Sequence, residues 1–187
     1  MTTSAIRTVD TPYGPLTLVA SDHGLTRATF RTLRRAAPPS TPAAHAWLDL
    51  AHRELDAYFA GELRHFTAPV DLSRVDDAHR RILDALAELL YGQTTTYGAL
   101  ATRLGLVEDG PRQVGAAMAR NPVLIIVPCH RVLGAGNTLT GYAGQDIFDG
   151  GAGGDTVDYS YNPASVSGTV LGTLSKLASD NTTFNNS

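Results

Sequence analysis

The chain has 187 residues, of which 43% are hydrophobic and 18% charged, a composition typical of a folded globular protein rather than a disordered one. The net charge is -3, and a single cysteine excludes an intramolecular disulfide and disfavours a zinc site. The N-terminus lacks the apolar core of a signal peptide, and no apolar stretch approaches the length of a transmembrane helix. We therefore expect a cytoplasmic protein with no membrane partner.

The charge is divided unevenly along the chain. Residues 1–144 hold 14 arginines and no lysine against 13 acidic residues, which gives +1. Residues 145–187 hold one lysine against five aspartates, which gives -4. The composition changes at the same point, so the sequence predicts a boundary near residue 144.

The first 72 residues predict a small supporting α/β domain. Turn residues separate three expected strands of a β-meander, at residues 5–9, 16–20 and 25–30. Apolar residues at helical spacing then predict a helix over residues 43–60, which Gly61 ends. Residues 66–70 predict an edge strand. No catalytic pattern occurs in this domain.

Residues 76–144 predict a mainly helical domain. Asp76 or Asp77 can cap a first helix that runs to Leu90. Thr95 or Thr96 can cap a second helix, expected over residues 97–104. Pro111 fits the first position of a third helix, expected over residues 111–120. Two short helices joined by a tight loop with glycine predict a helix-turn-helix. The fold class is thus α+β, followed by an irregular Gly- and Asp-rich tail over residues 145–187.

The helix over residues 111–120 carries small side chains, with arginines at its two ends. Its small residues are Gly115, Ala116, Ala117 and Ala119, and its cations are Arg112 and Arg120. No acidic residue lies between Pro111 and Arg131. A slim cationic helix can approach a nucleic-acid backbone closely. The alternative is a small-residue helix packed in a core, and this stretch alone does not distinguish the two.

The only cysteine follows an apolar run. Pro122 and Pro128 bracket five apolar residues that read as a buried strand, and Cys129, His130 and Arg131 come next. A thiol beside an imidazole and a guanidinium can form a thiolate. The alternative is a buried structural cysteine, which a lone Cys-His pair would favour.

Four blocks in order, TTTYGALATRLG, PRQVGAAMARNP, IIVPCHRV and LTGYAG, resemble the O6-alkylguanine-DNA alkyltransferase family. PYGPLTLVASDHGLTRATF is similar to that family's supporting domain, so the resemblance covers about residues 5–144. It implies repair of double-stranded DNA that contains O6-alkylguanine, by a monomer without a cofactor. The alkyl group would pass to Cys129 in a single turnover, and this reverses the preference for a structural cysteine.

The resemblance also implies residue roles. His130 would take the thiol proton through a water molecule, Arg112 would fill the space left by a flipped base, and Tyr97 would crowd the phosphate and donate its hydroxyl to that base. The other implied roles are DNA contacts at Gly115, Ala116 and Arg120, a substrate pocket at Val132, Tyr142, Ala143 and Gly144, a hinge at Asn121 and a structural ion pair at Arg131. The remaining histidines, at 23, 45, 52, 65 and 79, are expected to be surface or structural.

The sequence departs from the family after residue 144. In the family a helix follows GYAGG, and its glutamate holds the histidine; here Gln145 follows, and no glutamate occurs after Glu108. One alternative function is therefore a lesion-binding protein without efficient transfer.

A second alternative comes from the tail. Residues 150–158 fit the nonapeptide GGxGxDxUx of calcium-binding β-roll repeats, and residues 144–149 fit the end of a preceding copy. Asp146 and Asp155 would be the candidate calcium ligands, although so few copies do not build a stable roll. Residues 159–187 are expected to be disordered.

Overall fold

The structure is a computed structural model that describes residues 4–31, 33, 39–134, 138–140, 147–158 and 169–174, the last three ranges by their backbone alone. The chain forms two compact units. The first contains residues 1–91 and 120–127, and the second contains residues 92–119 and 128–187.

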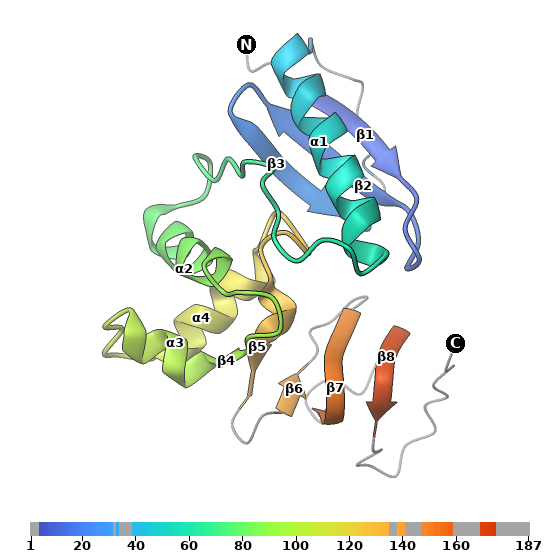
Figure 1. Cartoon of the computed structure of the whole chain (residues 1–187). Helices are drawn as coiled ribbons and strands as arrows, with labels where there is room; N and C mark the ends of the chain where they lie inside the picture. Colours follow the sequence, from blue (N-terminus) through green and yellow to red (C-terminus); the bar gives the residue numbers. More distant parts are fainter. Residues whose placement is uncertain are drawn as a thin grey trace. The chain divides into compact units, whose positions relative to one another are not determined.

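The first unit is built on an antiparallel meander with α1 (Pro42–Phe59) lying across it (Figure 1). The strands are β1 (Ala5–Val9), β2 (Leu16–Ser21) and β3 (Gly24–Thr29), in the order β1-β2-β3. The apolar residues that β2 and α1 bury against each other are Leu16, Leu18, Ala20, Leu48, Ala51 and Leu55. The predicted meander and helix are confirmed, because their apolar periodicities match the two faces that meet.

The predicted edge strand over residues 66–70 is wrong. The buried carboxylate of Glu54, on α1, accepts the backbone N–H groups of Thr67 at 2.9 Å and of Ala68 at 2.9 Å, and Pro69 has no N–H to donate. These groups are therefore not available to a strand ladder. What remains is a single parallel bridge between Leu25 and Val70.

Helix α2 (Asp77–Ala87) begins at the predicted cap. Asp76 accepts the backbone N–H of His79 at 3.1 Å, which satisfies one donor of the first turn. Ile82, Leu83 and Leu86 form the buried face. The helix ends at Ala87, before residue 90 where the sequence had placed its end, because the chain tightens after it: Leu89 N donates to Leu86 O at 3.0 Å, and Leu90 is exposed.

The predicted strand over residues 123–127 is also wrong. This apolar run is a buried turn with one parallel bridge between Val123 and Ala28. Ala28 donates to Pro122 O at 2.9 Å and accepts from Leu124 N at 3.0 Å. The run then folds back on itself, with Val127 N donating to Val123 O at 3.1 Å. Burial alone made it resemble a strand.

The second unit contains the two predicted short helices, α3 (Tyr97–Arg103) and α4 (Gly110–Ala119). Thr96 caps α3 by accepting Ala99 N at 3.0 Å. The two helices approach closely at Gly110, where an added Cβ would lie 2.8 Å from Ala101 Cβ. The approach requires a residue without a side chain.

The described residues of this unit also form a short turn and five strands. A 3₁₀ turn, η1 (Cys129–Arg131), leads into β5 (Val132–Leu133), which pairs in parallel with β4 (Thr95–Thr96). In the tail, predicted as irregular, the described backbone forms a parallel sheet in the order β6-β7-β8, made of Thr138–Thr140, Ile147–Asp158 and Thr169–Leu174. Among the described residues, none of the helices is both long enough and apolar enough to span a bilayer.

Asp71 provides a test of the first unit through acid stability. Its carboxylate accepts the Ser21 hydroxyl at 2.6 Å and the Ser73 N–H at 3.0 Å. Burial acts to raise the pKa of Asp71, but the hydrogen bonds from Ser21 and Ser73 outweigh it, so the pKa lies below the ordinary aspartate value. A lowered folded-state pKa stabilises the fold above the unfolded pKa, and this stabilisation is lost as the pH falls through the folded value.

We therefore expect Asp71→Asn to lower the free energy of unfolding by about 1 kcal/mol at pH 7, since a charge-assisted hydrogen bond becomes a neutral one. The difference should hold down to the unfolded pKa of about 3.9 and shrink at lower pH. Urea unfolding of both proteins between pH 7 and pH 2.5 measures it. A difference that stays constant over this range would contradict the assignment.

Candidate functional site

Cys129 opens η1 and is half-buried. The turn is closed by Arg131 N, which donates to Pro128 O at 3.0 Å, and by Val132 N, which donates to the carbonyl of Cys129. Cys129, His130 and Arg131 are all partly accessible, which fits a thiol that must meet a reagent from outside.

A short parallel strand pair brings Tyr97 to the same region. Thr95 lies opposite Val132 and Thr96 lies opposite Leu133. Tyr97 directly follows Thr96 and starts α3, so this pairing joins the start of a helix to a segment about 35 residues further along the chain. The side chain of Tyr97 is half-buried. The pairing assembles three predicted site residues, at positions 97, 129 and 132, in one unit.

Asn121 closes the apolar turn that precedes the cysteine. Its Nδ2 donates to Val127 O at 2.8 Å, and its Oδ1 accepts Val123 N at 3.0 Å. The residue is 9% exposed, so both hydrogen bonds are shielded from water. Within this turn Ile125 has φ +74°, a left-handed conformation that a β-branched residue rarely adopts. Asn121 therefore holds a strained backbone in place.

The two faces of α4 differ in burial: one is packed, as the core interpretation expected, while the approach of the other to a nucleic acid stays a prediction. Ala116 and Ala119 are exposed and Gly115 is half-buried, so the outer face is bare. Ala117 is fully buried with Val114 and Met118. The sequence had placed Ala117 among the small residues of the exposed face, and this is wrong, because at helical spacing Ala117 falls on the packed face.

Arg112 lies at the first turn of α4 with 82% of its side chain exposed. Its Nη1 is 3.1 Å from Asp109 Oδ2. Asp109 has φ +50°, which directs the chain into the helix. An exposed pair of this kind contributes little to stability, but it places a negative charge beside the cation.

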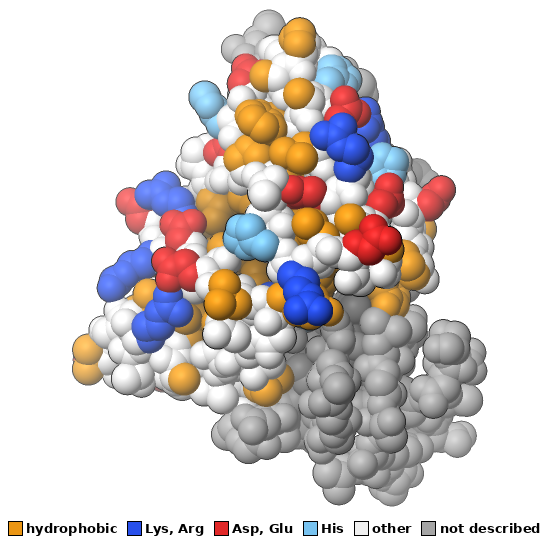
Figure 2. Space-filling model, in the orientation of Figure 1, with side chains coloured by type: hydrophobic (Ala, Val, Ile, Leu, Met, Phe, Trp, Pro, Cys, Tyr) orange, Lys and Arg blue, Asp and Glu red, His pale blue; other side chains and the backbone are white. Residues whose placement is uncertain are grey.

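Basic and acidic side chains are interspersed on the face that Figure 2 shows, without a broad patch of one sign. Attraction to a polyanion on this face must come from individual arginines rather than from a general basic field.

Several predicted residues cannot be placed. Tyr142, Ala143, Gly144 and Asp146 lie outside the described residues, and Asp155 is described only as part of the β7 backbone. Within the described part of the chain, no group of three or more His, Cys, Asp or Glu side chains could hold a metal ion.

Comparison with known proteins assigns the family. Residues 6–72 match the ribonuclease-like domain of 6-O-methylguanine DNA methyltransferase, and residues 77–152 match its DNA binding domain. The chain belongs to this family. The match to the DNA binding domain extends past residue 144, and the comparisons do not support the calcium-binding repeat.

Alignments with curated relatives span most of this chain. The methylated-DNA--protein-cysteine methyltransferase of Mycobacterium tuberculosis strain H37Rv is 44% identical over 142 residues, which is 74% of this chain and 83% of that protein. The protein of the same name from Methanosarcina acetivorans is 40% identical, covering 74% and 89%. A DNA base-flipping protein of Thermus thermophilus is 41% identical, covering 73% and 88%.

Solved structures agree with this family. The crystal structure of Mycobacterium tuberculosis O6-methylguanine methyltransferase superposes with a TM-score of 0.63 at 39% identity, covering 75% of this chain and 84% of that one. The Mycobacterium tuberculosis OGT in complex with DNA gives 0.62 at 42% identity, covering 74% and 83%. The predicted family and the α+β fold class are confirmed.

The Asn121 amide gives a direct test of the apolar turn. We expect Asn121→Ala to lower the free energy of unfolding by about 2 kcal/mol, because a buried N–H and a buried carbonyl lose their partners. Urea unfolding measures the change.

The matched control for this substitution is Gln113→Ala, which removes an exposed amide hydrogen bond to Glu108 O at 2.6 Å. Its expected cost is below about 0.5 kcal/mol. Equal losses in the two variants would show that burial of the Asn121 amide is not what matters.

Proposed function

We propose that this protein repairs DNA by moving an alkyl group from guanine O6 in double-stranded DNA to Cys129, once per molecule. The observation that carries the proposal is the pairing of β4 with β5, which joins Tyr97 to the Cys129–Val132 segment inside a domain that matches the family. Family membership supports the reaction class, and the accessible thiol supports Cys129 as the acceptor.

The reaction is an in-line displacement at the alkyl carbon. Cys129 gives its proton to His130, through a bridging water, and becomes a thiolate. The sulfur forms a bond to the alkyl carbon while the bond from that carbon to O6 breaks, and the bonding electrons stay on the guanine. The guanine takes up one proton and returns to its normal form. The products are a thioether and an unmodified base, so no oxidant, metal or cofactor is needed.

The target base must leave the double helix, because a half-buried thiol cannot reach O6 inside a base stack. In this proposal Arg112 fills the vacated space, and Tyr97 crowds the phosphate and donates its hydroxyl to the base. The bare outer face of α4 supports this role, since Gly115 and Ala116 allow the helix to approach the groove closely. Arg120 provides a further DNA contact after the helix.

The substrate pocket is proposed to include the carbonyls of Cys129 and Val132 as acceptors for the guanine amino group, with Ala143 N–H donating to O6. Tyr142 and Gly144 would complete its wall. Asn121 is proposed as the hinge before the active-site segment and Arg131 as a structural ion-pair partner. The protein would work as a monomer in the cytoplasm, with residues 1–72 as a supporting domain and 76–144 as the DNA-binding domain.

Intact-protein mass spectrometry tests the transfer. Incubation with a duplex that contains O6-methylguanine should raise the intact mass by one methyl group, and a digest should assign that group to the peptide that contains Cys129, because the thioether is stable. Cys129→Ala should gain no mass, and His130→Ala should react more slowly by about 10²-fold or more, since general-base help is lost.

If the wild-type mass stays unchanged while Cys129→Ala still binds the lesion duplex in preference to normal DNA, the transfer proposal is wrong. The protein would then be a lesion-binding module.

The ion pair at the start of α4 makes a second test. Asp109→Asn should tighten binding to duplex DNA by about twofold to fivefold at low salt, because it removes the negative charge beside Arg112. Asparagine also tolerates the positive φ. Fluorescence anisotropy with a labelled duplex measures the affinity, and the gain should shrink at high salt.

Glu108→Gln is the matched control for Asp109→Asn, since it removes one charge from the same loop but leaves the Arg112 pair in place. An equal gain from both variants would show that general charge, and not the pair, limits binding.

A further inference from the structure

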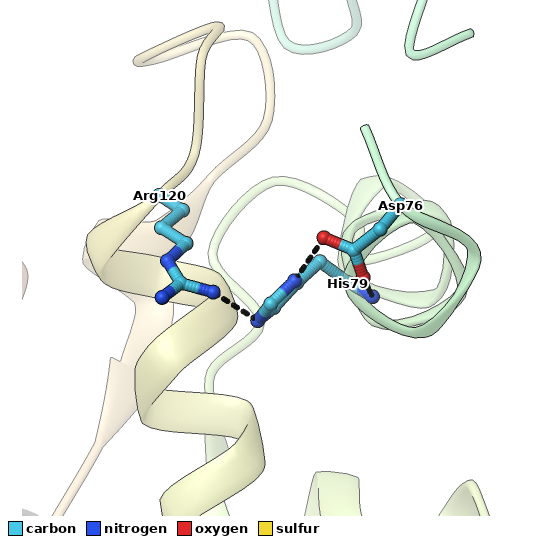
Figure 3. A network of polar contacts seen from close by, with 3 residues as sticks. All are labelled: Asp76, His79 and Arg120. Carbon is cyan, nitrogen blue, oxygen red and sulfur yellow. Dashed lines mark hydrogen bonds and ion pairs between the residues drawn. The ribbon is translucent and has the colours of Figure 1, made fainter. Parts of the chain in front are cut away.

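Three polar side chains of the first unit form a continuous chain of contacts that the sequence did not reveal. Figure 3 shows the imidazole of His79 lying between Asp76 and Arg120. His79 Nδ1 is 2.5 Å from Asp76 Oδ2, and His79 Nε2 is 3.3 Å from Arg120 Nη1. Asp76 and His79 belong to the start of α2, and Arg120 follows α4 in the chain. Residues 41 positions apart are thus connected.

The chemistry of the three groups fixes where the protons lie. A guanidinium has only donors, so His79 Nε2 accepts from Arg120 and carries no proton. The proton of the neutral ring is then on Nδ1, where it is donated to Asp76. The hydrogen bond from the His79 side chain, with that from the His79 backbone N–H, lowers the pKa of Asp76 below its usual value. The carboxylate is therefore ionised at neutral pH, and the two contacts of the ring support each other.

The contacts form a rigid support beneath an exposed cation. Asp76 is fixed by its other oxygen, which caps α2 through His79 N. The His79 side chain is only 16% exposed, so its ring has little room to turn. Arg120 is exposed. The cap of a helix thus determines the direction of a surface guanidinium through one half-buried ring.

We propose that Asp76 and His79 are positioning residues that orient Arg120 toward a phosphate of the DNA backbone. This inference rests on the proposed function. A guanidinium in direct contact with a carboxylate has its charge partly cancelled, whereas a neutral imidazole directs it and leaves the charge available. Arginine has five N–H donors, so one bond to His79 leaves others for phosphate oxygens.

Orientation before binding has a thermodynamic advantage. A long arginine side chain loses rotamer entropy when it is fixed on a phosphate. His79 supplies part of that ordering in the free protein. The sequence around Arg120 favours the same role, because residues 111–131 contain no acid. The contact is to the backbone of DNA and predicts affinity without base preference.

A pair of substitutions at position 79 separates positioning from packing. His79→Gln places an amide oxygen near the position of Nε2, where it can accept from Arg120. His79→Asn is shorter, so it can donate to Asp76 but does not reach Arg120. We expect His79→Asn to weaken binding to an unmodified duplex by about threefold to tenfold, and His79→Gln to restore most of the loss. The control is His52→Asn, which removes a comparable contact to Asp56 at 3.5 Å on α1 and should leave affinity unchanged.

Salt dependence distinguishes loss of orientation from loss of charge. Arg120→Ala should lower the slope of log K against log salt by about 1, because one phosphate contact is lost. His79→Asn should lower affinity while keeping most of the slope, since the cation remains. Equal weakening by His79→Asn and His79→Gln would overturn the proposal, and so would unchanged binding in Arg120→Ala.

A kinetic ratio separates this inference from the proposed function. The rate of methyl transfer from the duplex should fall in His79→Asn relative to the rate from free O6-methylguanine base, which needs no phosphate contact. A wild-type protein that transfers from neither substrate contradicts the proposed function, and the binding measurements then still decide the role of His79. An unchanged ratio, with transfer intact, contradicts the positioning role alone.

Discussion

The hydrogen bonds of the Asn121 side-chain amide are the interaction on which the turn before Cys129 depends. Residues 123–127 are apolar and, except for Leu124, buried, but they lack a strand ladder, so their backbone polar groups need other partners. Asn121 supplies one donor and one acceptor, to Val127 O and Val123 N, and it does so over the strained Ile125. The turn ends one residue before Pro128, where the chain passes into the second unit and reaches Cys129. A hinge role for Asn121 is consistent with this geometry.

Glu54 solves a similar problem in the first unit. Its carboxylate accepts backbone N–H groups of Thr67 and Ala68, so a loop without a ladder packs against α1. In both places a side chain substitutes for a neighbouring strand. A buried side chain that carries such hydrogen bonds is costly to replace, because its removal leaves several backbone groups without partners.

Sequence reasoning succeeded where local signals were sufficient. Asp76 and Thr96, each one of two predicted candidates, cap their helices, because capping depends on residues three positions apart. The family blocks predicted the family, which the comparisons confirm, while the role of Cys129 stays a prediction. The predictions were wrong at residues 66–70 and 123–127, where apolar content had indicated strands. Their actual conformation depends on Glu54 and Asn121, whose partners no local pattern indicates.

The sequence by itself determined the family, the α+β class and the helix starts, since these follow from motifs and short-range periodicity. Only the tertiary structure decided which face of α4 is bare, that β4 and β5 join Tyr97 to the Cys129–Val132 segment, and that His79 links Asp76 to Arg120. Each of these depends on contacts between residues far apart in the chain. Such contacts are selected by the packing of the whole domain, and a single histidine among six carries no mark of its partner in the sequence.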